Sequence, residues 1–248
     1  MFHLACYNGS VGAGLSNVDI AAVSDQALTI SNNHFVLTEP GRLLNAYAQG
    51  TDITNARVNT PKLRLISLPS LTPVNPGTLP GDLPPLVSFG DFPIGLDPID
   101  EIAVETTNSG AGAETHTVGL WLGFGARPIP SGPAYTIRAT STITGVSGSW
   151  SAGNIVLDQV LPAGRYSVIG LRVIAANCVF GRLIFPDMKY RPGTVASATA
   201  AQDDFSYVRF GRSGELGQFD SIAQPQLEVF VNGACTSQTI FMDVIKVR

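Results

Sequence analysis

The chain has 248 residues, of which 44% are hydrophobic and only 14% are charged, and its formal net charge is −4. The hydrophobic fraction is that of a globular protein and excludes a chain without a packed core. The negative net charge and the lack of a basic run argue against specific nucleic-acid recognition. Because so few charges oppose association, the composition favours a protein that hides part of its surface in an assembly.

Glycine and proline occur along the whole sequence. The 26 glycines and 17 prolines leave few windows long enough for a helix. This distribution favours short strands joined by turns, so it predicts an all-β fold with little helix. The best helix candidates are residues 15–28 and 196–209, which we expect in or before long connections between strands.

The first half contains several segments that alternate or concentrate apolar and β-branched residues, as strands do. Strands are predicted at 29–30, 34–38, 62–68, 102–106 and 115–124. The loop Asn108–Gly112, with the sequence Asn-Ser-Gly-Ala-Gly, predicts a hairpin between the last two of these strands.

The segment from Leu68 to Pro98 contains eight prolines in 31 residues. Such a density predicts an extended, rigid excursion with few backbone donors, and we expect it to shape a contact between subunits. Its counterpart in the second half, residues 186–217, has a different composition. Residues 126–133 contain three prolines and are the natural linker between two domains.

The second half shows the same kind of pattern. Strands are predicted at 135–144, 155–160, 166–174, 178–185, 227–231 and 239–247. Asn232-Gly233 predicts a second hairpin between the last two strands. Residues 166–185 approach the length of a membrane span, but Arg172 and Arg182 interrupt them at a cost of at least ~2.5 kcal/mol for a charge at the bilayer centre, so buried strands are the better interpretation. No secretory signal is recognisable in the first residues.

The two halves share short motifs in the same order, at offsets between 118 and 123 residues. The matched pairs are Gly41-Arg42 with Gly164-Arg165, Asn55 with Asn177, Arg64-Leu65-Ile66 with Arg182-Leu183-Ile184, Phe89-Gly90 with Phe210-Gly211, and Thr117 with Thr239. Chance similarity between strands would not keep a nearly constant offset along the chain, so the pattern predicts an internal duplication. A repeat of about 120 residues is the size of a whole β-sandwich. We expect an N-terminal arm at 1–25, sandwiches at 26–125 and 134–248, and the linker at 126–133.

Charge divides unevenly between the halves. Residues 1–125 hold 11 acidic and 4 basic side chains, a net charge of −7, and residues 126–248 hold 8 acidic and 11 basic ones, a net charge of +3. An acidic half and a basic half suit head-to-tail contact between copies. Drift of surface charge without consequence is the alternative.

No catalytic motif is recognisable. His3, His34 and His116 are isolated in sequence, and ordinary surface or core histidines are the simplest interpretation. The segment Gly145–Ser149 lacks the strand-turn-helix context of a nucleophile. The sequence therefore predicts no catalytic residue, and we expect a protein that is not an enzyme.

Candidate ligand sites are equally sparse. The acidic clusters Asp97/Asp100/Glu101 and Asp203/Asp204 match no calcium motif. Cys6, Cys178 and Cys235 fit neither a disulfide framework nor a zinc site, and we expect buried thiols. Trp121 and Trp150 are expected to fill one sandwich core each, with stacking on a sugar or base as the alternative. The sequence thus predicts no metal and no cofactor.

A tandem pair of such sandwiches, with low charge and no active site, resembles the double jelly-roll major capsid proteins of tailless icosahedral viruses. The resemblance covers nearly the whole chain and rests on the repeated Gly-Arg, Arg-Leu-Ile and Phe-Gly motifs. It implies two tandem jelly rolls, side by side, with the arm at 1–25 reaching inward or to a neighbour.

By the same resemblance, the protein would be a structural virion protein that forms homotrimers, which act as pseudo-hexameric capsomers in an icosahedral shell. Its partners would be neighbouring capsomers and minor or penton capsid proteins, and an internal membrane beneath the shell is compatible with it. Assembly would take place in the host cytoplasm. The alternative is a tandem β-sandwich that binds glycans, such as a lectin, an adhesin or a viral attachment protein. A lectin should carry an exposed aromatic beside a polar or calcium-bearing cleft, whereas a capsid subunit should carry large side surfaces.

Overall fold

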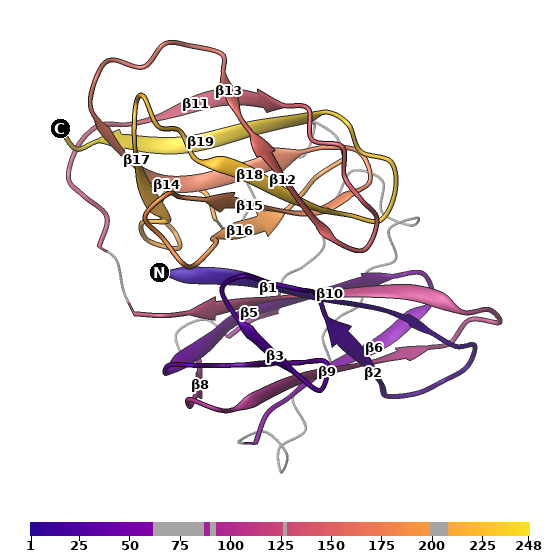
Figure 1. Ribbon diagram of the computed structural model, residues 1–248. Helices are drawn as coiled ribbons and strands as arrows, with labels where there is room; N and C mark the ends of the chain where they lie inside the picture. Colours follow the sequence, from indigo (N-terminus) through magenta and orange to yellow (C-terminus); the bar gives the residue numbers. More distant parts are fainter. Residues whose placement is uncertain (62–86, 90–92, 126–127, 199–207) are drawn as a thin grey trace. The chain divides into compact units, whose positions relative to one another are not determined.

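The computed structural model describes residues 1–61, 87–89, 93–125, 128–198 and 208–248. Within these residues the regular structure is β-strand without helix, and the strands pair in antiparallel ladders, which confirms the all-β prediction. The described chain divides into two compact units (Figure 1). The N-terminal unit comprises Ala5–Phe124, and the C-terminal unit comprises Gly125–Arg248 together with Met1–Leu4.

The N-terminal unit pairs its strands in two groups, joined where β1 meets β2. The first group has the order β1-β10-β5, and β7 and β8 pair with the other edge of β5. In the second group β9 pairs with β2, β4 and β6, and β3 pairs with β4. The strands are β1 (Phe2–Val11), β2 (Val18–Ala22), β3 (Thr29–Ser31), β4 (His34–Val36), β5 (Gly41–Gly50), β6 (Ile53–Asn59), β7 (Val87–Ser88), β8 (Ile94–Leu96), β9 (Glu101–Asn108) and β10 (Glu114–Gly123).

The C-terminal unit has two separate sheets. A five-stranded sheet has the order β13-β11-β19-β14-β17, and a four-stranded sheet has the order β12-β18-β15-β16. Its strands are β11 (Ala134–Ser141), β12 (Trp150–Asn154), β13 (Val156–Leu157), β14 (Arg165–Ile174), β15 (Cys178–Ile184), β16 (Gly193–Val195), β17 (Gly217–Asp220), β18 (Gln226–Val231) and β19 (Gln238–Lys246). The segment 166–185, which we expected to form buried strands, supplies most of β14 and β15.

The two units repeat one strand order. The series β1-β10-β5-β8 of the N-terminal unit corresponds to β11-β19-β14-β17, and β2-β9-β6 corresponds to β12-β18-β15. Two of the repeated motifs fall on corresponding strands, because Gly41 and Arg165 begin β5 and β14, and Thr117 and Thr239 lie in β10 and β19. A shared topology built from corresponding stretches of sequence is what an internal duplication predicts.

Both predicted hairpins are wrong, and in the same way. In place of a β9–β10 ladder, β9 pairs with β2, β4 and β6, while β10 pairs with β5 and β1. Likewise β18 pairs with β12 and β15, while β19 pairs with β11 and β14. The turn residues are present in each case, but the chain uses the turn to pass from one sheet to the other. In the N-terminal unit the Asn108 side chain fixes this passage by donating to the carbonyls of Val11, Gly12 and Gly112, at 2.9, 3.2 and 2.8 Å.

The expected N-terminal arm is also wrong, because residues 1–25 contain β1 and β2. Every residue from Phe2 to Tyr7 is buried. The helix expected at 15–28 is wrong for a related reason, as β2 occupies its centre and pairs with β9. The strand expected at 62–68, most of the proline-rich segment 68–98 and most of the helix candidate 196–209 lie outside the described residues.

Aromatic residues organise the core of the N-terminal unit. Tyr7 of β1 donates its hydroxyl to the Ile102 carbonyl of β9 and packs edge-on against Phe35 of β4, with ring centres 5.0 Å apart. Burial raises the Tyr7 pKa well above its ordinary value, so the hydroxyl stays protonated. Trp121 is fully buried, as predicted for a core tryptophan, whereas Trp150 of the C-terminal unit is only half-buried.

Candidate functional site

A buried charge cluster lies in the four-stranded sheet of the C-terminal unit. We call Arg182, Arg191 and Glu228 the Glu228 cluster. Arg182 of β15 and Glu228 of β18 are directly opposite each other in the ladder, and the Arg182 Nε donates to Glu228 Oε2 at 2.5 Å. Arg191 Nη1 donates to both carboxylate oxygens, at 2.7 and 2.8 Å. One carboxylate therefore serves two guanidinium groups, each within charge-assisted hydrogen-bond distance.

The Glu228 cluster also holds the start of the chain. Arg182 Nη1 donates to the Leu4 carbonyl at 2.9 Å, and the Leu4 amide donates to the Arg191 carbonyl at 3.0 Å. The Arg191 amide in turn donates to His3 Nδ1 at 3.0 Å. These bonds explain why Met1–Leu4 belong to the C-terminal unit although the rest of β1 does not.

The half-buried Trp150 completes the environment of Arg182, whose guanidinium carbon lies 3.8 Å from the centre of the indole ring. Such a cation–π contact is favourable when the cation is shielded from water. Because the Arg182 side chain is fully buried, it has no access to a substrate. The arrangement stabilises the sheet and its N-terminal edge, and it offers no catalytic chemistry.

A second buried ion pair lies in the five-stranded sheet. Asp243 of β19 accepts from Arg209 Nε at 2.7 Å and Nη2 at 3.0 Å, from the Phe210 amide at 3.0 Å and from Thr136 Oγ1 at 2.7 Å. Both side-chain contacts of Arg209 with Asp243 form one bidentate pair. Three other basic residues of the same unit, Arg212, Lys246 and Arg248, are exposed.

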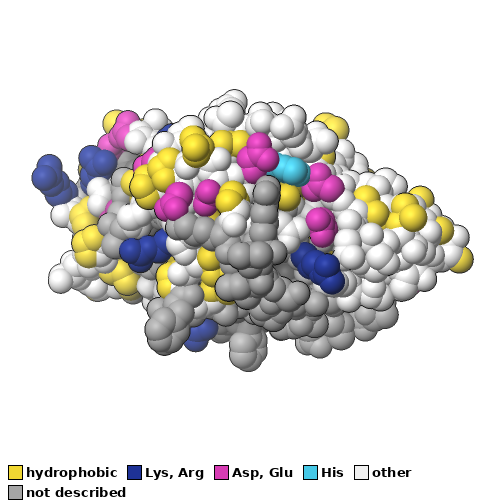
Figure 2. Space-filling model, turned by 90° about the horizontal axis from the view of Figure 1, so that it is seen from below, with side chains coloured by type: hydrophobic (Ala, Val, Ile, Leu, Met, Phe, Trp, Pro, Cys, Tyr) yellow, Lys and Arg dark blue, Asp and Glu magenta, His cyan; other side chains and the backbone are white. Residues whose placement is uncertain are grey.

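The three histidines lie in separate environments. His3 and His116 are fully buried. His116 Nδ1 lies 2.9 Å from Thr106 Oγ1, and burial lowers its pKa despite the opposing hydrogen bond with the Thr51 backbone and the charge of Glu114. His34 keeps some exposed surface, with Nε2 2.8 Å from Asp19 and Nδ1 3.6 Å from Glu101. Figure 2 shows a histidine flanked by acidic side chains, on a face that also carries several Lys or Arg side chains.

The acidic clusters do not converge on a ligand site in the part of the chain that is described. Asp97 and Asp100 form a local turn, in which the Asp97 amide donates to Asp100 Oδ2 at 3.0 Å. Glu101 faces His34 instead. No group of three or more histidine, cysteine or acidic side chains in the described ranges is arranged to hold a metal ion. Asp203 and Asp204 lie outside the described residues.

The structure brings two cysteines together that sequence reasoning treated as unrelated. Cys178 at the start of β15 and Cys235 in the β18–β19 connection have their sulfur atoms within hydrogen-bonding reach of each other. Cys6 is buried in the other unit. The spacing of Cys178 and Cys235 carries no motif, and only the path of the chain between the sheets reveals the pair.

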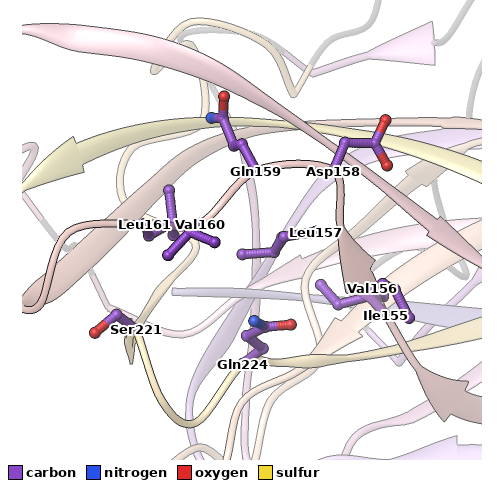
Figure 3. Close-up of a pocket in the computed structure, with 9 residues that line it drawn as sticks. All are labelled: Ile155, Val156, Leu157, Asp158, Gln159, Val160, Leu161, Ser221 and Gln224. Atoms are coloured by element: carbon purple, nitrogen blue, oxygen red, sulfur yellow. The ribbon is translucent and has the colours of Figure 1, made fainter.

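Exposed apolar side chains occur on two neighbouring segments of the C-terminal unit, one made of strand β13 and the loop after it, the other of the turn after β17. We call Val156, Val160 and Ile222 the apolar loop patch. Val160 is 97% exposed and Ile222 is 96% exposed, and Val156 is 65% exposed. A hollow of about 370 Å³ lies between these loops, lined by residues 155–161 from one side and by Ser221 and Gln224 from the other (Figure 3).

No helix in the described ranges has the length and apolar character needed to cross a membrane. Neither a protein-family model nor a curated protein matches the sequence.

Proposed function

We propose that the protein is a structural virion protein, the major capsid subunit of an icosahedral shell, built from two jelly rolls and assembled as homotrimers that act as pseudo-hexameric capsomers. The observation that carries the proposal is the nesting of strand pairs. Apart from the short β13, the described part of the C-terminal unit has eight strands. In chain order the first pairs with the eighth, the second with the seventh, the third with the sixth and the fourth with the fifth.

This nesting is the strand order of a jelly roll, in which an antiparallel ribbon of four strand pairs folds over into two facing sheets. The N-terminal unit has the corresponding outer pairs, β1 with β10, β2 with β9 and β5 with β8. Two such units in one chain support a double jelly roll. Capsid proteins and lectins both use this architecture, so the surface must decide between them.

The apolar loop patch supports assembly. Aliphatic side chains with nearly complete exposure are costly in water and mark contact surfaces when they cluster. The hollow between the loops is lined by aliphatic side chains together with Asp158, Gln159, Ser221 and Gln224, and none of its lining residues is an aromatic platform for a sugar. We assign the patch to contact with a second copy of the chain. The few charges of the whole sequence remove a barrier to that contact.

Light scattering on the purified protein, with negative-stain imaging of the same sample, tests the proposal. Trimers with a threefold, roughly hexagonal outline, or closed shells, are the expected result. A monomer that persists over the full range of soluble concentrations contradicts it. In that case the glycan-binding alternative is favoured, and binding to a glycan array is the next experiment.

A further inference from the structure

Two hydrogen bonds fasten the region around Cys178 to the β18–β19 connection. The Asn177 side chain donates from Nδ2 to the Ala234 carbonyl at 2.8 Å, and the Asn232 amide donates to the Asn177 carbonyl at 3.1 Å. Asn177 and Ala234 directly precede Cys178 and Cys235. The backbone therefore holds the two cysteines at a fixed separation, although 57 positions part them in the sequence.

The two sulfur atoms are chemically unequal. The Cys178 thiol has two acceptors within reach, the Phe180 carbonyl at 3.2 Å and the Cys235 sulfur. Cys235 also accepts from Gln238 Nε2 at 3.2 Å. These donors stabilise a thiolate, and they lower the pKa of Cys235 to about 6, the bond from Cys178 being the largest cause. The same bond, together with burial, raises the pKa of Cys178.

We propose that Cys178 and Cys235 form a reversible disulfide when a peroxide reaches the protein, with Cys235 as the attacking sulfur and Cys178 as the resolving one. This inference is independent of the proposed function. A thiolate beside a second thiol is the arrangement that oxidises to a disulfide instead of to higher acids. Cys178 is half-buried and Cys235 is buried, so a small oxidant would have to reach the pair past Cys178.

The chemistry balances as follows. The Cys235 thiolate attacks one oxygen of hydrogen peroxide, the O–O bond breaks, and hydroxide leaves and takes up a proton to become water. Cys235 is then a sulfenic acid. The Cys178 sulfur loses its proton and attacks the Cys235 sulfur, which forms the S–S bond and releases the second water. Two thiols are oxidised and one peroxide is reduced, and an added dithiol reverses the change.

The disulfide would tie the start of β15 to the passage between the two sheets. Such a bond closes a long loop in the unfolded chain, so the midpoint of thermal unfolding of the oxidised protein should rise on the order of 10 °C. The reduced and oxidised forms of the same preparation provide this comparison without a mutation.

The experiment treats the reduced, folded, full-length protein with hydrogen peroxide and follows intact mass, with tryptic peptides analysed afterwards without reduction. Cleavage after Arg172, Arg182, Arg212 and Lys246 places the two cysteines in separate peptides, 173–182 and 213–246. The expected result is the loss of two hydrogen atoms and a linked pair of these peptides. Cys6→Ser is the matched control and should behave like the wild type.

Cys178→Ser should not lose the two hydrogen atoms, and its Cys235 should instead be labelled by dimedone, which traps sulfenic acids. Three results would overturn the inference: cysteines that stay reduced as long as the protein is folded, a linkage to Cys6, or a linkage only between chains. If a variant fails to fold, the peptide map of the wild-type protein decides alone.

Discussion

Arg182 and Glu228 are directly opposite each other on neighbouring strands, and the Arg182 side chain also reaches the Leu4 carbonyl. One carboxylate thus neutralises two arginines, one of which binds the backbone of Leu4. Removing the carboxylate would leave two guanidinium groups in a buried place without their anionic partner. Breaking a buried pair from one side costs about 3–5 kcal/mol, because the remaining charge stays desolvated.

The first prediction concerns Glu228→Gln, which keeps the shape of the side chain and removes its charge. We expect the free energy of unfolding of the C-terminal unit to fall by about 3 kcal/mol or more, measured by urea denaturation with tryptophan fluorescence. Asp158→Asn is the control, because it breaks the exposed Arg138–Asp158 pair of the same unit, and exposed pairs contribute less than about 1 kcal/mol. Equal effects of the two variants would contradict the role of the Glu228 cluster.

The second prediction concerns Gly170, whose lack of a side chain leaves space for the Asp243 carboxylate. The β14–β19 ladder has a bulge between Val168 and Gly170, and a Cβ on Gly170 would lie 2.0 Å from Asp243 Oδ2. Gly170→Ala must therefore displace the carboxylate from Arg209, and we expect a loss of at least about 2 kcal/mol in the free energy of unfolding.

Gly95→Ala is the matched control for Gly170→Ala. Gly95 also lies in a strand, but a Cβ there meets no atom within 4 Å. Thermal and urea denaturation of both variants give the comparison. A Gly170→Ala protein as stable as the Gly95→Ala protein would show that Asp243 is not confined as we describe.

The third prediction is a pH dependence caused by His116. Burial lowers its pKa in the folded state, so between that lowered value and the ordinary value near 6.5 the unfolded chain binds more protons than the folded one. The free energy of unfolding should therefore fall as the pH drops from 7 to 5. His116→Gln removes this titration and should flatten the fall.

Urea denaturation at several pH values measures this slope. His34→Gln is the control, since it retains His116 and should keep the part of the slope that His116 causes. If His116→Gln shows the same slope as the wild type, burial of a neutral His116 does not contribute to the pH dependence.

The all-β class could be predicted from the sequence because local composition indicates it. The repeat was predicted from the spacing of Gly-Arg and related motifs. It failed at strand pairing. Asn232-Gly233 marks a turn, but a turn does not determine which strands lie beside β18, and in the structure β18 pairs with β12 and β15. The first strand was missed because the small and polar residues after Tyr7 conceal its length.

The Glu228 cluster and the cysteine pair could not be predicted from the sequence for a related reason. Arg182, Arg191 and Glu228 come from three segments, and their meeting depends on the register of β15 with β18. Cys178 and Cys235 meet because the chain crosses between sheets after β18, where a hairpin had been expected. Long-range pairing decides such sites, whereas local patterns decide only the elements.

The most direct test of the assembly proposal changes the apolar loop patch and measures molecular mass. Val160→Asp combined with Ile222→Asp places two charges on the patch, and Val146→Asp is the control. Val146 is 62% exposed, and its loop lies beside Val231, the last residue of β18. The apolar loop patch lies near Gln224, which comes just before the first residue of β18, so the control and the patch are at opposite ends of that strand. All three side chains are exposed, so folding should be retained in every variant.

Light scattering of the wild type, the double variant and the control at one matched concentration gives the answer. The account predicts trimers or larger assemblies for the wild type and for Val146→Asp, and monomers for the double variant. A double variant with the same mass as an assembled wild type would contradict the role of the patch, and a monomeric wild type would contradict the capsid proposal itself.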